Sequence, residues 1–325
     1  MGSEARKRSR ERIREIREKE KRAAKRNKTL LVLGAAALVV VAIVGIGYLV
    51  LNADRGDGYE GALAPQVLQE DGSVVMAQEG AQAPVVEVYA DYQCPACRQF
   101  ELLNGDVLKE NAAEGRAIVQ YRPVSIFAQR PEPISGNSLR AGVAARAAAD
   151  HDRFVEFNDL LFQNQPTEGR EGFTPDELKE WFAQTDPSEQ QQEQFDRRVD
   201  EESAVVEEFT GDYLPALSQD AAEQIGQDTL NTMVLADLMT WGADNGHDPS
   251  FLEGTYTGQI IEATGNAYTR YSGENAFRGT PSVYVNGELL DNDTAMTARG
   301  LNEAIASAEP GEVDSAPLGD GGGAE

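Results

Sequence analysis

Cysteine and histidine are the scarcest reactive residues in this chain, with two of each among 325 residues. A single cysteine pair cannot build the framework of several disulfides on which small secreted scaffolds depend. A zinc site usually takes four ligands, and His151 and His247 lie outside ligand spacing from Cys94 and Cys97. The composition therefore argues against a disulfide-framework protein and against a zinc protein, and we expect neither a metal nor a cofactor.

Basic residues are scarce outside the first 28 positions. Those 28 residues hold 13 Lys or Arg and 5 acidic residues, whereas the rest of the chain holds 16 basic and 50 acidic residues, a net charge of −34. Such an acidic surface repels nucleic acid and anionic lipid, so neither is an expected partner of it. We interpret residues 1–28 as a basic cytoplasmic head that sets the topology and is attracted to the inner leaflet.

Charged residues are absent from residues 29–51, a run of 23 residues dominated by Leu, Val, Ala, Ile and Gly. This run can span a hydrocarbon core of roughly 30 Å, and it exceeds the roughly 7–15 apolar residues of a secretory signal. A buried globular helix of this length should show a polar face. Because basic residues flank only its N-terminal side, we predict an uncleaved single-pass transmembrane helix with the rest of the chain extracytoplasmic.

The extracytoplasmic part divides into three stretches. Residues 52–72 have few large apolar side chains and are interpreted as a linker, and residues 309–325 as a disordered acidic tail. Between them, the pattern from about 138 to 275 is helical, with start signals at Thr174-Pro175 and Asp186-Pro187. Strands are expected at 73–76, 85–90, 117–121 and 282–285, the last continuing through an Asn286-Gly287 turn into a hairpin, and a final helix at 296–308.

The two cysteines, Cys94 and Cys97, enclose Pro95 and Ala96. The segment before them has the apolar pattern of a buried strand, and residues 98–109 have that of a helix. A Cys-x-x-Cys pair at a strand-to-helix junction is typical of a thiol–disulfide redox site.

The expected helix explains why the two thiols would differ. With Cys94 at the N-cap, Pro95 fits the first helical position, and the N–H groups of Ala96 and Cys97 are free to point at the Cys94 sulfur. Together with the partial positive charge of the helix N-terminus, they favour the thiolate. We therefore expect Cys94 to be the exposed nucleophile and Cys97 the resolving thiol.

Two other uses of the cysteine pair remain open at this point. A structural disulfide across so short a loop would stabilise little. A metal site would need ligands beyond the two cysteines, and the two histidines are better interpreted as surface or helix-end residues. The redox interpretation is favoured over both.

Residues 91–101, which surround the cysteines, resemble the active-site segment of DsbA-like disulfide oxidoreductases. Residues 279–287, Gly-Thr-Pro-Ser-Val-Tyr-Val-Asn-Gly, resemble the cis-proline loop and following hairpin of that family, and residues 138–141 and 157–162 resemble its inserted helices. The likeness covers about residues 73–308, and the membrane-anchored, acidic form is similar to versions found in high-GC Gram-positive bacteria.

The resemblance implies an α/β, thioredoxin-like fold with a helical domain inserted at about 138–275. It implies that Thr280 and a cis Pro281 lie beside Cys94, where their loop holds an extended substrate and keeps metals off the dithiol. It also implies exported protein substrates and a quinone-linked membrane oxidase, of the DsbB or vitamin-K-epoxide-reductase type, that reoxidises the pair.

Two features depart from the family pattern. The family often has a buried acid six positions before the first cysteine, where this chain has Val88; the adjacent Glu87 should point to the other face of the strand. The stretch between Gln190 and Gly265 is also longer and more acidic than the family pattern, and we assign it no function.

The leading hypothesis is an extracytoplasmic oxidoreductase that introduces disulfides into exported proteins. The same chemistry run backwards would make the chain a disulfide reductase or isomerase, because Ala96 supplies no side-chain donor to the thiolate. A third hypothesis, from a different class, is a non-catalytic binding module for an envelope protein. The motif favours a redox enzyme over this last alternative but does not set the direction of the reaction.

Overall fold

The computed structural model describes Tyr59 and residues 61–167 and 169–315. The predicted head and transmembrane helix, residues 1–28 and 29–51, lie outside the described residues. Within the described part, no helix combines the length and apolar character needed to cross a membrane. The described residues from Gly61 onward belong to one compact unit.

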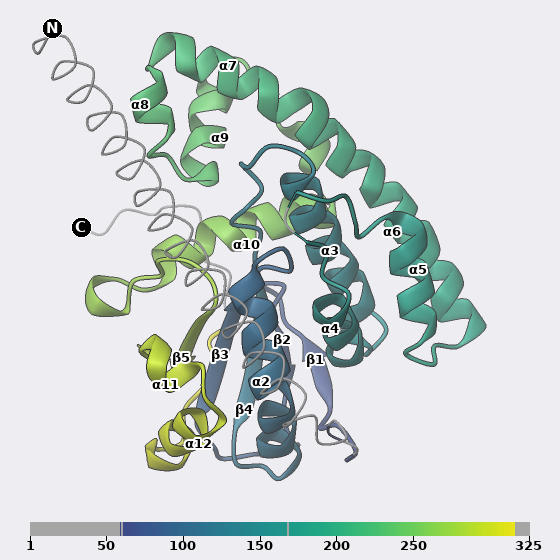
Figure 1. Ribbon diagram of the computed structural model, residues 1–325, viewed down its shortest axis with the longest axis vertical. Coiled ribbons are helices and arrows are strands. Elements are labelled where there is room, and N and C mark those ends of the chain that lie inside the picture. The colour runs from purple at the N-terminus through teal and green to yellow at the C-terminus, as the bar shows by residue number, and fades with distance from the viewer. Residues whose placement is uncertain (1–58, 60, 168, 316–325) are drawn as a thin grey trace, which may run out of the picture. The chain divides into compact units, whose positions relative to one another are not determined.

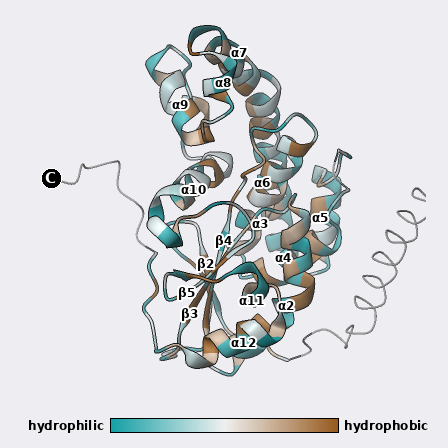
Figure 2. Ribbon diagram, turned by 60° about the vertical axis from the view of Figure 1, so that its left-hand side comes forward, coloured by the Kyte–Doolittle hydropathy of each residue, from teal (hydrophilic) through white to brown (hydrophobic). Residues whose placement is uncertain are grey.

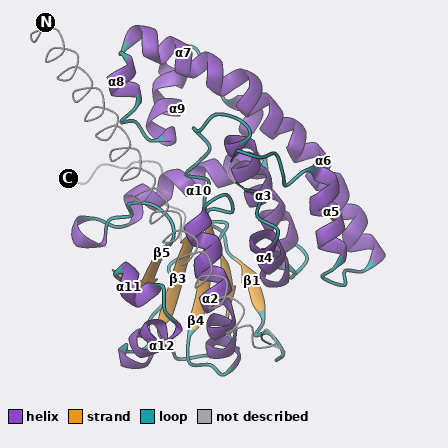
Figure 3. Ribbon diagram, viewed as in Figure 1, coloured by secondary structure: helices purple, strands orange, loops and turns teal. Residues whose placement is uncertain are grey.

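A six-stranded mixed sheet forms the centre of this unit (Figures 1 and 3). Its spatial order is β1-β2-β4-β3-β5-β6, in which β3 and β4 are parallel and every other neighbouring pair is antiparallel. Parallel neighbours need a crossover, which helix α2 provides. The strands are β1 (Gln66–Leu68), β2 (Val74–Met76), β3 (Val85–Ala90), β4 (Ile118–Pro123), β5 (Ser282–Val285) and β6 (Glu288–Leu289), and α2 spans Pro95–Ala113.

The two faces of β3 pack against different helices. Val86 and Val88 belong to the main apolar cluster with α2 residues, whereas Tyr89 packs with residues of the helix Tyr256–Arg270 (α10). Successive strand side chains point to opposite faces, which accounts for this split. Glu87 therefore lies on the face opposite Val88, as the sequence predicted.

The hairpin between β5 and β6 forms at the predicted turn. Asn286 and Gly287 both have positive φ, 50° and 81°, the requirement of the two-residue turn that suits twisted strands. The Asn286 side chain also accepts a hydrogen bond from the Val85 N–H at 2.8 Å and donates one to the Glu309 carbonyl at 2.7 Å. One turn residue thus joins β3, the hairpin and the chain after the last helix.

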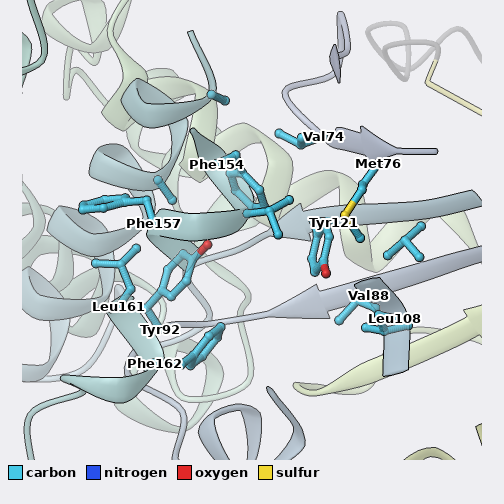
Figure 4. Packing of buried hydrophobic residues seen from close by; sticks show 14 of the residues in the cluster. Val74, Met76, Val88, Tyr92, Leu108, Tyr121, Phe154, Phe157, Leu161 and Phe162 are labelled. Carbon is cyan, nitrogen blue, oxygen red and sulfur yellow. The ribbon is translucent and has the colours of Figure 1, made fainter. Parts of the chain in front are cut away.

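Helices occupy the chain between β4 and β5, where the helical insertion was predicted. The aromatic residues Phe154, Phe157 and Phe162 of α4 are buried in the main cluster, as expected (Figure 4). The helices of this block are α3 (Ile134–Ala149), α4 (Phe154–Gln163), α5 (Pro175–Ala183), α6 (Glu189–Glu208), α7 (Leu214–Gln224), α8 (Gln227–Leu230), α9 (Leu235–Asp244) and α10, and after the hairpin come α11 (Asn292–Ala295) and α12 (Ala298–Ser307).

Two helix starts test the capping signals directly. Thr174 caps α5, with Pro175 in the first turn and a reciprocal capping box with Glu177, as predicted. The start predicted at Asp186-Pro187 is slightly too early. Helix α6 begins after Ser188, which forms a capping box with Gln191. A serine cap with a glutamine three residues on satisfies two backbone N–H groups.

The long acidic stretch after Gln190 forms α6 to α10. A π-helical turn at Phe209–Tyr213 joins α6 directly to α7, and both helices show hydrophobic and hydrophilic faces in Figure 2. Their apolar side chains, including Phe209 and Leu217, form a second cluster with α3, α9 and α10. The stretch is therefore an amphipathic extension of the insertion with a core of its own.

Two boundaries differ from the sequence prediction. Strand β1 lies inside the predicted linker 52–72 and pairs with β2. At the other end, Gly311 N–H donates to the Ala83 carbonyl at 3.1 Å, and Gln120 and Arg122 donate to the Asp314 carbonyl. Residues 309–314 are thus hydrogen-bonded to the sheet, although they are polar and were assigned to the tail; residues 316–325 lie outside the described part.

Candidate active site

The cysteine pair lies where β3 ends and α2 begins. Cys94 is the N-cap of α2, with extended dihedral angles of φ −80° and ψ 116°. Pro95 occupies the first helical turn, where its missing N–H leaves no hydrogen bond unmade. The side chains of Pro95 and Ala96, between the two cysteines, are exposed.

The loop before β5 is the second wall of the site. Register pairs Tyr89 of β3 with Ser282 of β5, which brings the preceding loop next to the end of β3. The Thr280–Pro281 peptide bond is cis, as the resemblance implied. The Cys94 sulfur lies 3.4 Å from the Thr280 carbonyl oxygen. The structure therefore brings together Cys94, Pro95, Ala96, Cys97, Thr280 and Pro281, although long stretches of chain separate the two loops.

The exposure of the thiols differs from the prediction in one respect. Both cysteines are free thiols, and both are buried. Cys94 is 5% exposed and Cys97 is 0% exposed. The expectation of an exposed Cys94 was therefore wrong in degree, and its sulfur lies against the Thr280 carbonyl. The order is as expected, since Cys94 is the more accessible of the two.

Hydrogen bonds stabilise the thiolate of Cys94. A bond from the Cys97 thiol is the largest cause lowering the Cys94 pKa, which falls to about 6 although burial opposes it. The Thr280 side chain and the backbone N–H groups of Cys97 and Ala96 lower it further. Within the described part of the chain, the buried Thr280 hydroxyl has no hydrogen-bond partner, whereas the Thr280 carbonyl is the group in hydrogen-bond contact with the Cys94 sulfur. The Cys94 side chain makes no capping hydrogen bond to the helix, although the N–H groups of Cys97 and Ala96 lower its pKa.

Cys97 has the opposite tendency. Burial is the largest cause raising its pKa well above the ordinary value, and the neighbouring Cys94 raises it further. Cys97 remains a protonated thiol under conditions in which Cys94 is ionised. The pair therefore consists of one thiolate near the surface and one thiol beneath it.

The helical insertion also holds the active-site loop, through a residue that the sequence analysis missed. Gln165, in the loop after α4, donates its side-chain amide to the carbonyls of Tyr92 at 2.7 Å and Cys94 at 2.9 Å. Arg98 of α2 donates back to the Phe162 carbonyl at 2.9 Å. A glutamine in a polar loop carries no sequence signal for this role, because the contact depends on how the two domains pack.

Asp91 was also missed as a site residue, although it lies within the motif. It is 0% exposed at the end of β3. Its carboxylate accepts hydrogen bonds from the Gln93 N–H at 2.8 Å, the Ser138 hydroxyl at 2.8 Å and the Phe127 N–H at 3.2 Å. It thereby connects the catalytic loop to the segment after β4 and to α3. The signal available in the sequence was an aspartate that lies between the apolar run of a buried strand and the Cys-x-x-Cys pair.

The other residues considered in the sequence analysis are Val88, Glu87 and the two histidines. Val88 lies in the same apolar cluster as the two cysteines, whereas Glu87, on the other face, accepts a hydrogen bond from Arg122 Nε at 2.7 Å. His151 packs against the Phe182 ring, and His247 Nε2 lies 3.0 Å from an Asp220 oxygen. Among the described residues, no group of three or more His, Cys, Asp or Glu is arranged to hold a metal ion.

Residues 72–215 match the family model described as Thioredoxin. This range contains both cysteines and the first half of the insertion. No curated protein matches the chain.

Several solved structures are loosely similar to the chain. MdbA, a thiol-disulfide oxidoreductase from Actinomyces oris, is 17% identical, with 79% of this chain and 99% of that chain covered and a TM-score of 0.48. Oxidised BdbD from Bacillus subtilis is 17% identical, with 76% and 97% covered and a TM-score of 0.44. Reduced DsbA from Mycobacterium tuberculosis is 20% identical, with 76% and 99% covered and a TM-score of 0.40.

Because these TM-scores lie below 0.5, we base the fold assignment on the sheet topology and the family match. A β3-α2-β4 crossover with a parallel strand pair, followed by an antiparallel hairpin and a last helix, surrounds the inserted helices. The chain therefore has a thioredoxin-like α/β fold, and its only cysteine pair lies within the residues that match the family model.

Proposed function

We propose that the chain is an extracytoplasmic thiol–disulfide oxidoreductase that forms disulfide bonds in exported proteins. The observation that carries this proposal is the unequal dithiol. The pKa of Cys94 is lowered to about 6 chiefly by the Cys97 thiol, whereas burial raises that of Cys97. An attacking or leaving sulfur needs thiolate character, which the lowered pKa gives to Cys94.

The reaction begins with the oxidised pair. A substrate thiolate attacks the Cys94 sulfur, the Cys94–Cys97 bond breaks, and Cys97 takes up a proton because its pKa is raised. The second substrate thiol then loses its proton and attacks the substrate sulfur of the mixed disulfide, which releases Cys94 as a thiolate. The substrate loses two electrons, and the cysteine pair gains them.

The low Cys94 pKa also supports the direction of transfer. A leaving group with a low pKa leaves fast, and stabilisation of the reduced form makes the disulfide form a stronger oxidant. Ala96 supplies only its backbone N–H to this stabilisation, so the Thr280 loop and the Cys97 thiol contribute the rest. This observation favours oxidation of substrates over the reductase or isomerase alternative.

Location and partners are part of the same proposal. We place residues 29–51 in the membrane, with the thioredoxin-like domain outside it, because basic residues precede the apolar run. Each turnover leaves the pair reduced, so the cycle needs an electron acceptor. A quinone-linked membrane oxidase of the DsbB or vitamin-K-epoxide-reductase type, in the same membrane, fits that need.

The proposal is tested with the oxidised full chain and a reduced protein substrate whose thiols are counted by alkylation. We expect stoichiometric transfer of one disulfide per chain, and loss of transfer in Cys94→Ser. The matched control is Gln99→Ala, an exposed change on α2 that leaves both thiols and the residues between them in place and should transfer normally. Failure of the wild-type chain to oxidise the substrate, together with a Cys94→Ser chain that behaves identically, contradicts the proposal and favours the binding-module alternative.

The direction is tested in the cell by alkylating free thiols before lysis. An oxidase whose disulfide is regenerated by a membrane partner is expected to be mostly disulfide-bonded at Cys94 and Cys97. A mostly reduced pair in growing cells would instead support a reductase.

A further inference from the structure

The helical insertion contacts the active-site segment through the end of α4 and the loop that follows it. The Tyr92 hydroxyl donates to Asn158 Oδ1 at 2.9 Å, and the Tyr92 ring centroid lies 4.8 Å from that of Phe162 (Figure 4). Arg98 Nε donates to the Phe162 carbonyl at 2.9 Å, so a cation meets a carbonyl in the last turn of α4. Because Tyr92 and Arg98 lie on either side of the cysteine pair in the sequence, the insertion contacts both flanks of that pair.

Gln165, in that loop, is hydrogen-bonded to the backbone of the active-site segment. Its Nε2 atom donates to the Tyr92 carbonyl at 2.7 Å and to the Cys94 carbonyl at 2.9 Å. A primary amide nitrogen carries two N–H groups, so each carbonyl can take one of them. Tyr92 and Cys94 are both buried, and an unpaired carbonyl in such surroundings costs free energy. The Gln165 amide thus bridges the turn that leads into Cys94.

The backbone of Cys94 is held at both of its polar groups. Its N–H donates to the Asp91 carbonyl at 3.0 Å, and its carbonyl accepts the Arg98 N–H of α2 at 3.2 Å, in addition to the Gln165 amide. A single side-chain torsion separates the sulfur from this backbone, so the backbone largely fixes where the sulfur lies. That sulfur is 3.4 Å from the Thr280 carbonyl. A shift of the Cys94 backbone would therefore move the sulfur relative to the Thr280 loop.

The insertion fixes the loop that carries Gln165. Asn137, a fully buried residue of α3, donates its side-chain amide to the Arg170 carbonyl at 2.8 Å and accepts the Gly172 N–H at 3.1 Å. The loop is therefore held by α4 at its start and by α3 further along. The position of the Gln165 amide is thus set by the insertion.

We propose that Gln165 is a positioning residue for disulfide exchange, whose amide holds the carbonyls of Tyr92 and Cys94 and thereby keeps the Cys94 sulfur in its reactive place. This inference rests on the oxidoreductase function proposed above. In disulfide exchange the attacking, central and leaving sulfurs must be aligned, and a displacement of about 1 Å can cost up to about 100-fold in rate. Gln165 acts through the Cys94 backbone rather than on the sulfur. The helical insertion thus takes part in the chemistry of the dithiol as a support for Cys94.

The same support bears on the Cys94 thiolate. The Cys97 thiol is the largest cause lowering the Cys94 pKa, and the N–H groups of Cys97 and Ala96 lower it further. Such donors act on the sulfur only at hydrogen-bonding distance. When Gln165 is lost, the turn before α2 is freer to move, and the donors hold the sulfur for less of the time. We therefore expect a slower exchange at Cys94 and a thiolate that forms at higher pH.

The test compares Gln165→Leu with a matched control, Asn164→Ala. Leucine is similar in size to glutamine but has no donor. Asn164 is exposed, and its side-chain amide donates to the Leu160 carbonyl of α4 at 2.8 Å. The control therefore removes a side-chain amide next to Gln165 without removing a contact to the active-site segment. For each reduced full-length chain, the rate of reaction with glutathione disulfide is measured at about pH 7, and the Cys94 thiolate is titrated by its ultraviolet absorbance.

In Gln165→Leu we expect the reaction with glutathione disulfide to slow by roughly tenfold or more, and the thiolate titration to move to higher pH. Asn164→Ala should match the wild type in both. Thermal unfolding shows that each chain is folded at the temperature of the rate measurement. A merely structural role would lower the unfolding temperature and leave the rate and the titration of the folded chain unchanged. That result would overturn the proposal.

A second pair of variants keeps the proposal testable if Gln165→Leu does not fold. Gln165→Glu keeps the shape of the side chain, but its ionised carboxylate cannot donate to either carbonyl. Asn164→Asp adds the same charge at the neighbouring position. We expect the reaction to slow by roughly tenfold or more in Gln165→Glu and to stay within about twofold of the wild type in Asn164→Asp. Equal rates in the two variants would overturn the proposal.

Cys94→Ser, measured in parallel, separates this inference from the function on which it rests. A wild-type chain that reacts no faster than Cys94→Ser would overturn the oxidoreductase function and the inference with it. A wild-type chain that reacts much faster than Cys94→Ser, together with a Gln165→Leu chain as fast as the wild type, would overturn the inference alone.

Discussion

Two buried carboxylates lie close together in the sequence but in opposite environments. Glu87 belongs to β3, and Asp91 directly follows that strand. Glu87 faces α10, where Arg122 Nε donates to it at 2.7 Å and the Tyr271 hydroxyl also donates. Asp91 faces the dithiol and has only neutral donors. Glu87 is thus paired with a cation, whereas burial raises the pKa of Asp91 to about 7. The fold thus keeps a carboxylate that is held in an ion pair apart from a carboxylate whose protonation can change near neutral pH.

The largest effect is expected from a substitution that breaks the ion pairs around Glu87. Arg122 also pairs with Asp71, and both of these carboxylates are buried. Arg122→Ala leaves them without this partner, and we expect a loss of about 3–5 kcal/mol in the free energy of unfolding, measured with urea. The Cys94 titration should be unchanged in the folded variant. If the Cys94 titration moved together with the stability, the ion pairs around Glu87 and the dithiol would not be independent.

The pH dependence of stability is the next effect. The folded pKa of Asp91 is raised to about 7, above its unfolded value, so the folded state binds more protons between about pH 4 and about pH 7. The stability contributed by Asp91 is therefore full at low pH and is lost as the pH rises through about 7, by at most about 4 kcal/mol.

Asp91→Asn should make the free energy of unfolding of the reduced protein depend less on pH across this range, while Glu101→Gln should reduce the loss that continues to about pH 8, since the Glu101 pKa is raised to about 8. Thermal unfolding at several pH values checks both. A wild-type chain whose stability rises steadily between about pH 5 and about pH 7 would show that Asp91 is a fixed charge.

The smallest expected effect comes from Ser138→Ala. The Ser138 hydroxyl donates to the Asp91 carboxylate at 2.8 Å, so its loss should cost about 1–2 kcal/mol and should raise the Asp91 pKa further. Calorimetry measures the loss of stability, and an infrared titration of the carboxyl band measures the change in the Asp91 pKa. Unchanged stability with an unchanged carboxyl band would show that this hydrogen bond does not link α3 to the site.

Much of the local structure was predictable because its causes lie close together in the sequence. Asn286-Gly287 specified the hairpin through positive φ, Thr174 specified a helix start, and Cys94-Pro95 specified an N-cap followed by a proline. Each signal depends on neighbouring residues only. The start of α6 shows the limit of such local signals. Two capping signals compete there, and the helix begins after Ser188, the one that forms a capping box.

The contacts that complete the site were not predictable in the same way. The partner of Gln165 is the carbonyl of Cys94, and that of Asp91 is the hydroxyl of Ser138. Nothing in the local pattern of a polar loop or a helix start identifies a partner so far along the chain. The placement of Thr280 beside Cys94 came from the family resemblance rather than from spacing, and it required the register of β5 on β3.

The most direct test of the central claim uses the chain's two cysteines one at a time. Cys97→Ala leaves Cys94 as the only thiol, and Cys94→Ala leaves only Cys97, which is 0% exposed. Each full-length variant is mixed with a protein carrying an activated disulfide, and mixed disulfides are counted by mass spectrometry. The account predicts much faster capture by Cys97→Ala than by Cys94→Ala, although loss of the Cys97 thiol raises the Cys94 pKa. Equal capture by the two variants, or none by either, would contradict it.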